Sequence, residues 1–478
     1  MLRKPYVRLA LLACTFILCH LPLFQYFVMP DHEFFVCCDV NRYLLAYANK
    51  MKEGLIPYRD FESEYPPVAL LLFLLPALVT TELGVYQYLF AIGQFLFEII
   101  GLLITNALLQ RMQAKRGEAT FVILGYMLLL ASLGSILYSR YDMTVSTLVI
   151  AALYMFLIRK KKRAWVVLAI SVMTKPYTIV IAPLFLISQL PDAKKAIPIL
   201  LEGFLSFLST LFVIALPFLL ISFDDFLQSF VFHTERGIQI ETLYSSFIHI
   251  FHTLGAITEV HTEFRYGAFE LISPVSPFLS KLAFFLTAAG LLGVYLIFYK
   301  VNMGFPSEPE SLETRTLHLY RASVIAILTF ILFYKVFSSQ FLIWVYPLVP
   351  LVCRQPELRA KVINGLLILS GEVTQLIYPL NYVLVNGFWK PIFVILTVRN
   401  GILLLCLVLL GVWSSIKTEK RVFQFSLLII TLLGIYLLML FPIQYHMQEF
   451  PTKFNVLLFL LAMGAFLLWC RHNGVSSV

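Results

Sequence analysis

Asp39 is the residue whose position most suggests chemistry. It begins the stretch 39–53, which ends at Gly54. Apolar side chains recur within this stretch at three- and four-residue steps, at Val40, Tyr43, Leu44, Tyr47 and Met51. That spacing predicts an amphipathic helix lying on a membrane surface. A carboxylate at a helix start is either an N-cap for free backbone N–H groups or a general base held at the mouth of a cavity.

Two segments, residues 30–81 and 222–272, are rich in carboxylates. Their acidic residues are Asp31, Glu33, Asp39, Glu53, Asp60, Glu62, Glu64, Asp224, Asp225, Glu235, Glu241, Glu259, Glu263 and Glu270. Charged groups avoid the bilayer core because desolvating them is costly. We therefore expect both segments, and any chemistry they carry, at a membrane–water boundary.

The composition is that of a membrane protein. Hydrophobic residues make up 60% of the 478 residues and charged residues 13%, with a mean hydropathy of +0.85. A soluble chain is roughly 45–50% apolar and about 25% charged. This excludes a soluble enzyme, a nucleic-acid-binding protein and a disulfide-rich secreted domain. The seven cysteines show no metal-binding spacing such as CxxC, so no metal site is predicted.

Basic clusters give the expected topology. They lie at residues 3–8, 111–116, 159–163, 194–195, 300–321, 354–361, 417–421 and 471, and together hold 23 of the 36 Lys and Arg. The positive-inside rule places such clusters in the cytoplasm. We expect a single integral membrane domain over 1–478, all-helical, with roughly 12–14 spans. The segments 30–81 and 222–272 are then the two long outer loops.

The apolar run 66–79 is too short for a span. About 20 apolar residues are needed to cross a bilayer, and this run begins with Pro66 and Pro67 and contains Pro76. Counting it as a span would also put the 111–116 cluster outside. We therefore expect an interfacial or re-entrant helix in the first outer loop.

Five blocks resemble one family of glycosyltransferases. They are Asp39 with Gly54-Leu55-Ile56-Pro57-Tyr58 and Tyr65-Pro66-Pro67-Val68; Ser139-Arg140-Tyr141-Asp142; Thr174-Lys175-Pro176-Tyr177, in which Pro and Tyr are reversed; residues 235–241 (ERGIQIE); and residues 335–344 (KVFSSQFLIW). The blocks are similar to those of glycosyltransferase family 87, polyprenol-phosphate-mannose-dependent enzymes of the GT-C type. The resemblance implies a GT-C fold without a cofactor. It also implies that a hexose, mannose in this family, is transferred on the extracytoplasmic side.

The resemblance also implies roles for individual residues. Asp39 would be the general base of an inverting transfer. The chemistry of such a transfer also needs positive charge at the phosphate of the polyprenyl-phosphate donor. The candidates, chosen for their charge near the membrane boundary or, for His233, for its position three residues before Arg236, are Arg236, Lys335, Lys175, His233 and Arg399. Six residues would line the substrate pocket: Asp142, Glu241, Gln340, Tyr58, Glu64 and Tyr65. The acceptor would be a lipid, a glycan or a protein, at the plasma membrane if the chain is prokaryotic.

Several of these residues could instead have a purely structural role. Lys and Arg near a membrane boundary often only extend their charge into water, and His233 could be a structural loop residue. Glu98 and Glu372 lie inside predicted spans, where acids are often functional. They keep open a second class of function, a secondary transporter or lipid flippase.

Overall fold

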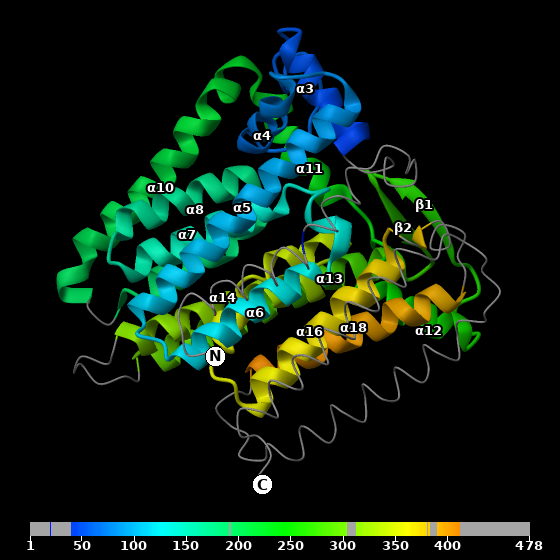
Figure 1. Ribbon diagram of the computed structural model, residues 1–478. Coiled ribbons are helices and arrows are strands. Elements are labelled where there is room, and N and C mark those ends of the chain that lie inside the picture. Colours follow the sequence, from blue (N-terminus) through cyan, green and yellow to red (C-terminus); the bar gives the residue numbers. More distant parts are fainter. Residues whose placement is uncertain are drawn as a thin grey trace.

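The computed structural model describes residue 20 and residues 40–190, 193–303, 312–379, 381–382 and 390–411. Asp39, the predicted first span at residues 7–29 except His20, and the apolar runs after residue 411 lie outside the described residues. Most of the regular structure is helical, and the long helices lie side by side in a bundle (Figure 1). The predicted helical class is confirmed.

Six helices in the described ranges are long and apolar enough to cross a membrane. They are α5 (Leu83–Arg111), α10 (Ala193–Ile221), α13 (Ser276–Met303), α14 (Leu312–Phe333), α16 (Leu358–Ile377) and α18 (Lys390–Gly411). Three shorter helices pack against them: α6 (Arg116–Ala131), α7 (Asp142–Leu157) and α8 (Lys161–Thr174). The protein is therefore a multi-pass membrane protein. The total of 12–14 spans stays a prediction, because it includes segments outside the described ranges.

The helix predicted over residues 39–53 is present from Val40 onward. It consists of a π-helical turn, η1 (Val40–Leu44), that continues into α3 (Leu45–Lys52). Gly54 ends it with a φ of 91°, a conformation that favours glycine. The apolar side of this helix is buried against α4 (Pro67–Ala77), and Nζ of Lys52 donates to the carbonyl of Ala77 at 3.1 Å.

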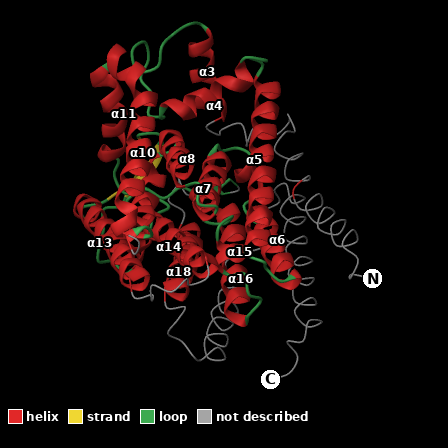
Figure 2. Ribbon diagram, turned by 90° about the vertical axis from the view of Figure 1, so that its left-hand side faces the viewer, coloured by secondary structure: helices red, strands yellow, loops and turns green. Residues whose placement is uncertain are grey.

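α4 is the short helix expected within the run 66–79. Its 11 residues span about 16 Å, roughly half of the bilayer core. Pro67 occupies the first turn, where a missing N–H costs nothing. Figures 1 and 2 show α3, α4 and α11 (Phe223–Glu235) together at one end of the bundle.

The resembling block 174–177 lies where one helix ends and another begins. α8 ends at Thr174, and Lys175 adopts an extended conformation. This fits the residue before a proline, whose backbone is pushed out of the helical region. The chain then continues into a 3-10 helix, η3 (Pro176–Ile181), and into α9 (Ala182–Ile187).

The segment 222–272 contains a β-hairpin that the sequence analysis did not predict. After α11 and α12 (Leu243–Thr253), strands β1 (His261–Arg265) and β2 (Ala268–Ile272) pair antiparallel. Tyr266 and Gly267 form the two-residue turn, both with positive φ, as such hairpins require. The remaining short elements are η2 (Gly134–Leu137), η5 (Ser339–Trp344) and α15 (Val349–Val352).

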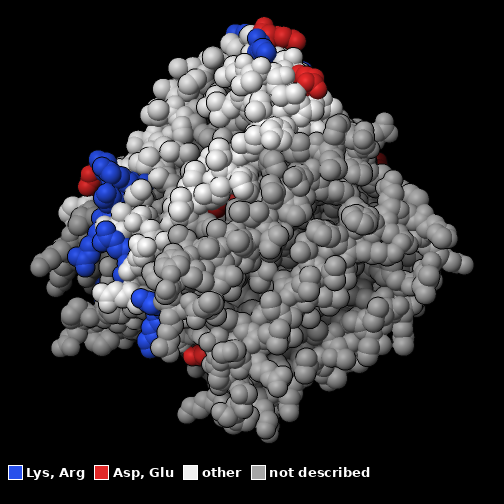
Figure 3. Space-filling model, in the orientation of Figure 1, with Lys and Arg blue, Asp and Glu red and all other residues white. Residues whose placement is uncertain are grey.

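Charge is distributed unevenly over the face shown in Figure 3. Lys and Arg gather on the left, where α5 ends and α8 begins, while Asp and Glu are prominent at the top, near α3. The exposed basic residues at these helix ends are Arg111, Lys115, Arg116, Lys162 and Arg163. These are the ends that the charge rule assigns to the cytoplasm.

The packing of α10 on α8 yields a prediction about stability. A Cβ on Gly203 would lie 2.4 Å from Cδ1 of the fully buried Trp165. We expect Gly203→Ala to push the two helices apart and to lower the free energy of unfolding by about 1–3 kcal/mol. Gly293→Ala in α13 is the control, since nothing lies within 4 Å of its Cβ position. Thermal unfolding in detergent measures both, and equal melting temperatures would contradict the prediction.

Candidate active site

Residues 236–241 form a segment outside the helices that is held on both sides. On one side it pairs with the hairpin: the N–H of Ile240 donates to the carbonyl of Phe269 at 3.0 Å, and the N–H of Leu271 donates to Ile238 at 2.8 Å. On the other side the N–H of Gln239 donates to the carbonyl of Lys335 at 3.0 Å. The hairpin and the chain that follows α14 therefore fix this segment together.

Arg236 and Lys335 lie on the two chains that meet at this junction. Nη2 of Arg236 donates to the carbonyl of Tyr266 at 2.8 Å, and Nζ of Lys335 donates to the carbonyl of Thr234 at 2.7 Å. Burial lowers the pKa of Lys335; the nearby charge of Glu270 raises it and that of Arg236 lowers it. Within the described part of the chain, neither cation forms an ion pair with a carboxylate. Two neighbouring cations of this kind are suited to an anion.

His233 connects the segment 222–272 to the segment 30–81. Its Nε2 lies 3.1 Å from the carbonyl oxygen of Glu64, whose carboxylate accepts a hydrogen bond from the Tyr47 hydroxyl at 2.7 Å. Burial lowers the pKa of His233 to about 4, and the charges of Arg236 and Lys175 contribute to this lowering. A neutral ring that donates from Nε2 keeps Nδ1 as an acceptor. This geometry favours a positioning role over the predicted contact with a phosphate.

Lys175 is already paired with a carboxylate. Its Nζ lies 2.6 Å from Oδ1 of Asp142, which is fully buried and also accepts a hydrogen bond from the indole N–H of Trp344. The ring centres of Tyr141, Trp344 and Phe341 lie 4.6, 5.2 and 5.5 Å from the ammonium group. Asp142 and the three rings therefore stabilise the lysine charge where it is. We assign Lys175 to the wall of the site.

Arg399 is paired as well, inside the bundle. Its Nη1 lies 2.8 Å from Oε2 of Glu241, and its Nη2 donates to the Glu241 carbonyl at 2.6 Å. Ser339 donates to the same carboxylate at 2.7 Å, and Asn400 donates to the same carbonyl at 3.2 Å. Arg399 is 0% exposed. The arginine therefore anchors the end of the segment 236–241 to α18.

The predicted pocket residues of the first outer loop pack together. The Tyr58 hydroxyl donates to the carbonyl of Tyr65 at 2.6 Å, and the Tyr58 ring meets that of Phe226 edge-on at 5.1 Å. The Tyr65 ring lies 5.9 Å from that of Tyr141, next to Lys175. Gln340 is half-buried in η5, the helix that also carries Phe341 and Trp344. The structure thus brings the first loop against the second and against Tyr141, which lies next to Lys175.

Asp39 itself lies outside the described residues, but the helix that follows it reaches the cationic junction. A Cβ on Gly267, in the hairpin turn, would lie 3.9 Å from the Tyr43 hydroxyl and 4.0 Å from Nη2 of Arg236. The first turn of the helix and Arg236 therefore border the same hairpin turn. The predicted role of Asp39 stays a prediction.

Four residues of this region were missed as site residues: Trp344, Ser339, Asn400 and Glu270. Each left a sequence signal. Trp344 and Ser339 lie within the block 335–344, Asn400 follows an arginine inside an apolar run, and Glu270 interrupts an apolar strand. The sequence did not reveal their partners, which lie far away along the chain.

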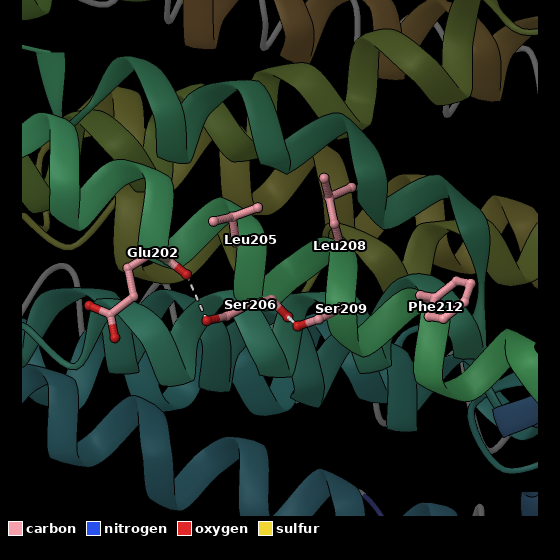
Figure 4. Close-up of a pocket in the computed structure, with 6 residues that line it drawn as sticks. All are labelled: Glu202, Leu205, Ser206, Leu208, Ser209 and Phe212. Atoms are coloured by element: carbon pink, nitrogen blue, oxygen red, sulfur yellow. Dashed lines mark hydrogen bonds between the residues drawn. The ribbon is translucent and has the colours of Figure 1, made fainter.

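A surface pocket lies elsewhere, on α10. It has a volume of about 470 Å³ and is lined by Glu202, Leu205, Ser206, Leu208, Ser209 and Phe212 (Figure 4). All six belong to one helix. The hydroxyl groups of the two serines donate to backbone carbonyls of that same helix, at Glu202 and Ser206. The pocket therefore offers little to recognise a substrate. No group of three or more metal-ligating side chains occurs in the ranges that the structure describes.

The state of His233 gives a pH-dependent prediction. Because its folded pKa is lowered from 6.5 to about 4, only the unfolded protein takes up this proton between those pH values. The free energy of unfolding therefore decreases as the pH is lowered from 6.5 to 4, and the contribution of His233 to this decrease is at most about 3 kcal/mol. His233→Gln removes this contribution and keeps an N–H for Glu64.

Thermal unfolding of the wild type and of His233→Gln at pH 7, 5.5 and 4.5 tests this. We expect the melting temperature of the wild type to fall more steeply with acid than that of the variant. Parallel curves would contradict the assignment of a neutral, buried His233.

The chain is similar in sequence to a known protein family and in structure to a solved protein. Residues 64–307, just over half of the chain, match glycosyltransferase family 87. No curated protein sequence matches. Two similar structures are those of ArnT from Cupriavidus metallidurans, bound to undecaprenyl phosphate and in the apo state. The first is 13% identical, covers 86% of this chain and 78% of that chain, and has a TM-score of 0.43. The second is 12% identical, covers 84% and 76%, and has the same TM-score.

The family match rests on sequence and covers three of the five resembling blocks in full, including the segment that carries Arg236. The six long apolar helices are consistent with a membrane-embedded member of this family. The chain is a multi-pass membrane protein that belongs to glycosyltransferase family 87.

Proposed function

We propose that this membrane glycosyltransferase is a GT-C type enzyme that uses a polyprenyl-phosphate sugar. It transfers a hexose, in our proposal mannose, to a lipid, glycan or protein acceptor on the extracytoplasmic side. The observation that carries the proposal is the pair Arg236 and Lys335, two neighbouring cations without an ion-pair partner among the described residues. The ArnT structure with undecaprenyl phosphate illustrates the class of ligand.

The phosphate is the leaving group, so the site needs positive charge where charge develops. Arg236 supplies a planar fork of donors and Lys335 a compact charge. Lys175 and Arg399 are engaged with Asp142 and Glu241. We therefore place the phosphate at Arg236 and Lys335.

The acceptor hydroxyl needs a base. In the proposal, Asp39 removes this proton while the hydroxyl oxygen attacks the anomeric carbon from the face opposite the phosphate. One displacement of this kind inverts the configuration, and a second nearby carboxylate as nucleophile is not required. Glu64 is held by Tyr47, and Tyr65 lies beside it to line the acceptor side.

The structure gives the acids inside the spans partners within the bundle. Glu98 is fully buried, lies 2.8 Å from Nδ1 of His20 and accepts a hydrogen bond from Tyr138 at 2.9 Å. Gln375 lies beside Glu372 in α16. Such fixed contacts fit a structural role and give the transporter alternative no specific support.

Transfer of labelled mannose from polyprenyl-phosphate-mannose in nanodiscs tests the proposal. Loss of a general base lowers the rate about 10²–10⁴-fold, and we expect this for Asp39→Asn. Asp224→Asn, at an exposed acid in α11, should transfer like the wild type. An Asp39→Asn protein with the wild-type rate would overturn the proposed base. Loss of lipid translocation in Glu98→Gln, with no transfer by the wild type, would favour a transporter.

The orientation has its own test. In a cysteine-free background, we expect Glu62→Cys to react with an impermeant thiol reagent added outside the cell, because Glu62 is exposed in the first outer loop. Arg163→Cys, at the basic start of α8, should react only after the membrane is opened. The reverse pattern would contradict an outward-facing site.

A further inference from the structure

Glu270 is a buried carboxylate in an otherwise apolar strand. It is 4% exposed, within the sequence AFELI of β2. Its Oε1 accepts a hydrogen bond from the backbone N–H of Gly237 at 2.6 Å. Burial raises the pKa of Glu270, and the hydrogen bond from Gly237 lowers it in part. A carboxylate in such a place needs a reason, because desolvating it is costly.

The carboxylate of Glu270 occupies the space that a side chain at position 237 would need. A Cβ on Gly237 would lie 2.5 Å from Oε2 of Glu270, too close for any side chain unless the carboxylate moves. The φ of Gly237 is not in the left-handed region, so its backbone does not require glycine. Contact with Glu270 is therefore the constraint that requires glycine here.

The contact fixes the chain next to the two free cations. Gly237 directly follows Arg236, and Gln239, which pairs with Glu270 across the ladder, donates its N–H to the carbonyl of Lys335. Arg236 and Lys335 are also close enough to Glu270 to lower its pKa. The Glu270 carboxylate thus fixes the backbone directly after Arg236, and the Glu270 backbone lies opposite Gln239, which holds the carbonyl of Lys335.

We propose that Glu270 is a positioning residue, which fixes the segment 236–239 through Gly237 so that Arg236 and Lys335 both face the phosphate of the lipid donor. This inference rests on the proposed function, because it presumes that the two cations bind that phosphate. Glu270 itself does not touch the donor.

Positioning and simple electrostatics predict opposite effects. A negative charge beside two cations weakens their hold on an anion, so its removal alone would tighten phosphate binding. Glu270→Ala and Glu270→Gln both remove the charge, but only the glutamine keeps an oxygen that accepts from Gly237. A positioning residue is thus revealed by a difference between these two variants.

The experiment measures equilibrium binding of undecaprenyl phosphate to the full chain in nanodiscs. We expect Glu270→Ala to bind about tenfold more weakly, which corresponds to roughly 1.4 kcal/mol. Glu270→Gln should bind as tightly as the wild type or more tightly. The control is Glu263→Gln, the residue opposite Glu270 in the hairpin, whose carboxylate pairs with Arg265; it should bind like the wild type. Equal or tighter binding by Glu270→Ala would overturn the proposal.

Gly237→Ala provides a second route if Glu270→Ala does not fold. Its Cβ should displace the carboxylate and weaken binding by a similar factor. In the double variant Gly237→Ala/Glu270→Ala the clash is gone, so the second substitution should add little. Fully additive losses would show that the two residues act independently and would contradict the proposal.

The result separates this inference from the proposed function. Arg236→Ala is the reference for the phosphate site. If it binds undecaprenyl phosphate like the wild type, the proposed phosphate site fails, and with it the role given to Glu270. If Arg236→Ala loses affinity while Glu270→Ala does not, only the positioning role fails.

Discussion

The buried ion pair between Arg399 and Glu241 is the interaction on which the site depends. It joins a membrane-spanning helix, α18, to the segment 236–241. Removing one partner of such a pair leaves an uncompensated buried charge and costs about 3–5 kcal/mol. Here Ser339 and Asn400 add hydrogen bonds to the same residue, Glu241. These contacts of Glu241 therefore fix the end of the segment 236–241 relative to α18 and η5.

From that anchor the rest of the site follows along the chain. Ile240 and Ile238 pair with β2, Gln239 holds the carbonyl of Lys335, and Arg236 reaches the hairpin turn. The cations then fall into two groups. Lys175 and Arg399 are neutralised by carboxylates and stabilise the structure. Arg236 and Lys335 keep their charge available to an anion, as transfer from a phosphate donor requires.

The parts of the fold set by local sequence were predictable. The three- and four-residue apolar spacing predicted the helix after Asp39, and Gly54 predicted its end. Each depends on residues within a few positions. The hairpin was missed, because its turn, Tyr266-Gly267, lacks the usual Asn-Gly or Asp-Gly signal and its strands are only five residues long.

For the site, the sequence predicted the types of residue but not their partners. The sequence identified candidate cations, but the partners of these cations decide their roles. Arg399 and Glu241 are 158 residues apart. Asp142, at the start of α7, and Lys175, directly after the end of α8, are 33 residues apart. No periodicity in the sequence encodes such pairs, so a paired cation and a free one look alike until the chain is folded.

The most direct measurement is a cryo-EM structure of the protein in nanodiscs with undecaprenyl phosphate. The account predicts the phosphate within hydrogen-bond distance of the Arg236 guanidinium and the Lys335 ammonium, with the Lys175–Asp142 and Arg399–Glu241 pairs intact. A phosphate bound by Lys175 or Arg399 after either pair has opened, or one held at the basic helix ends near Arg163, would contradict it.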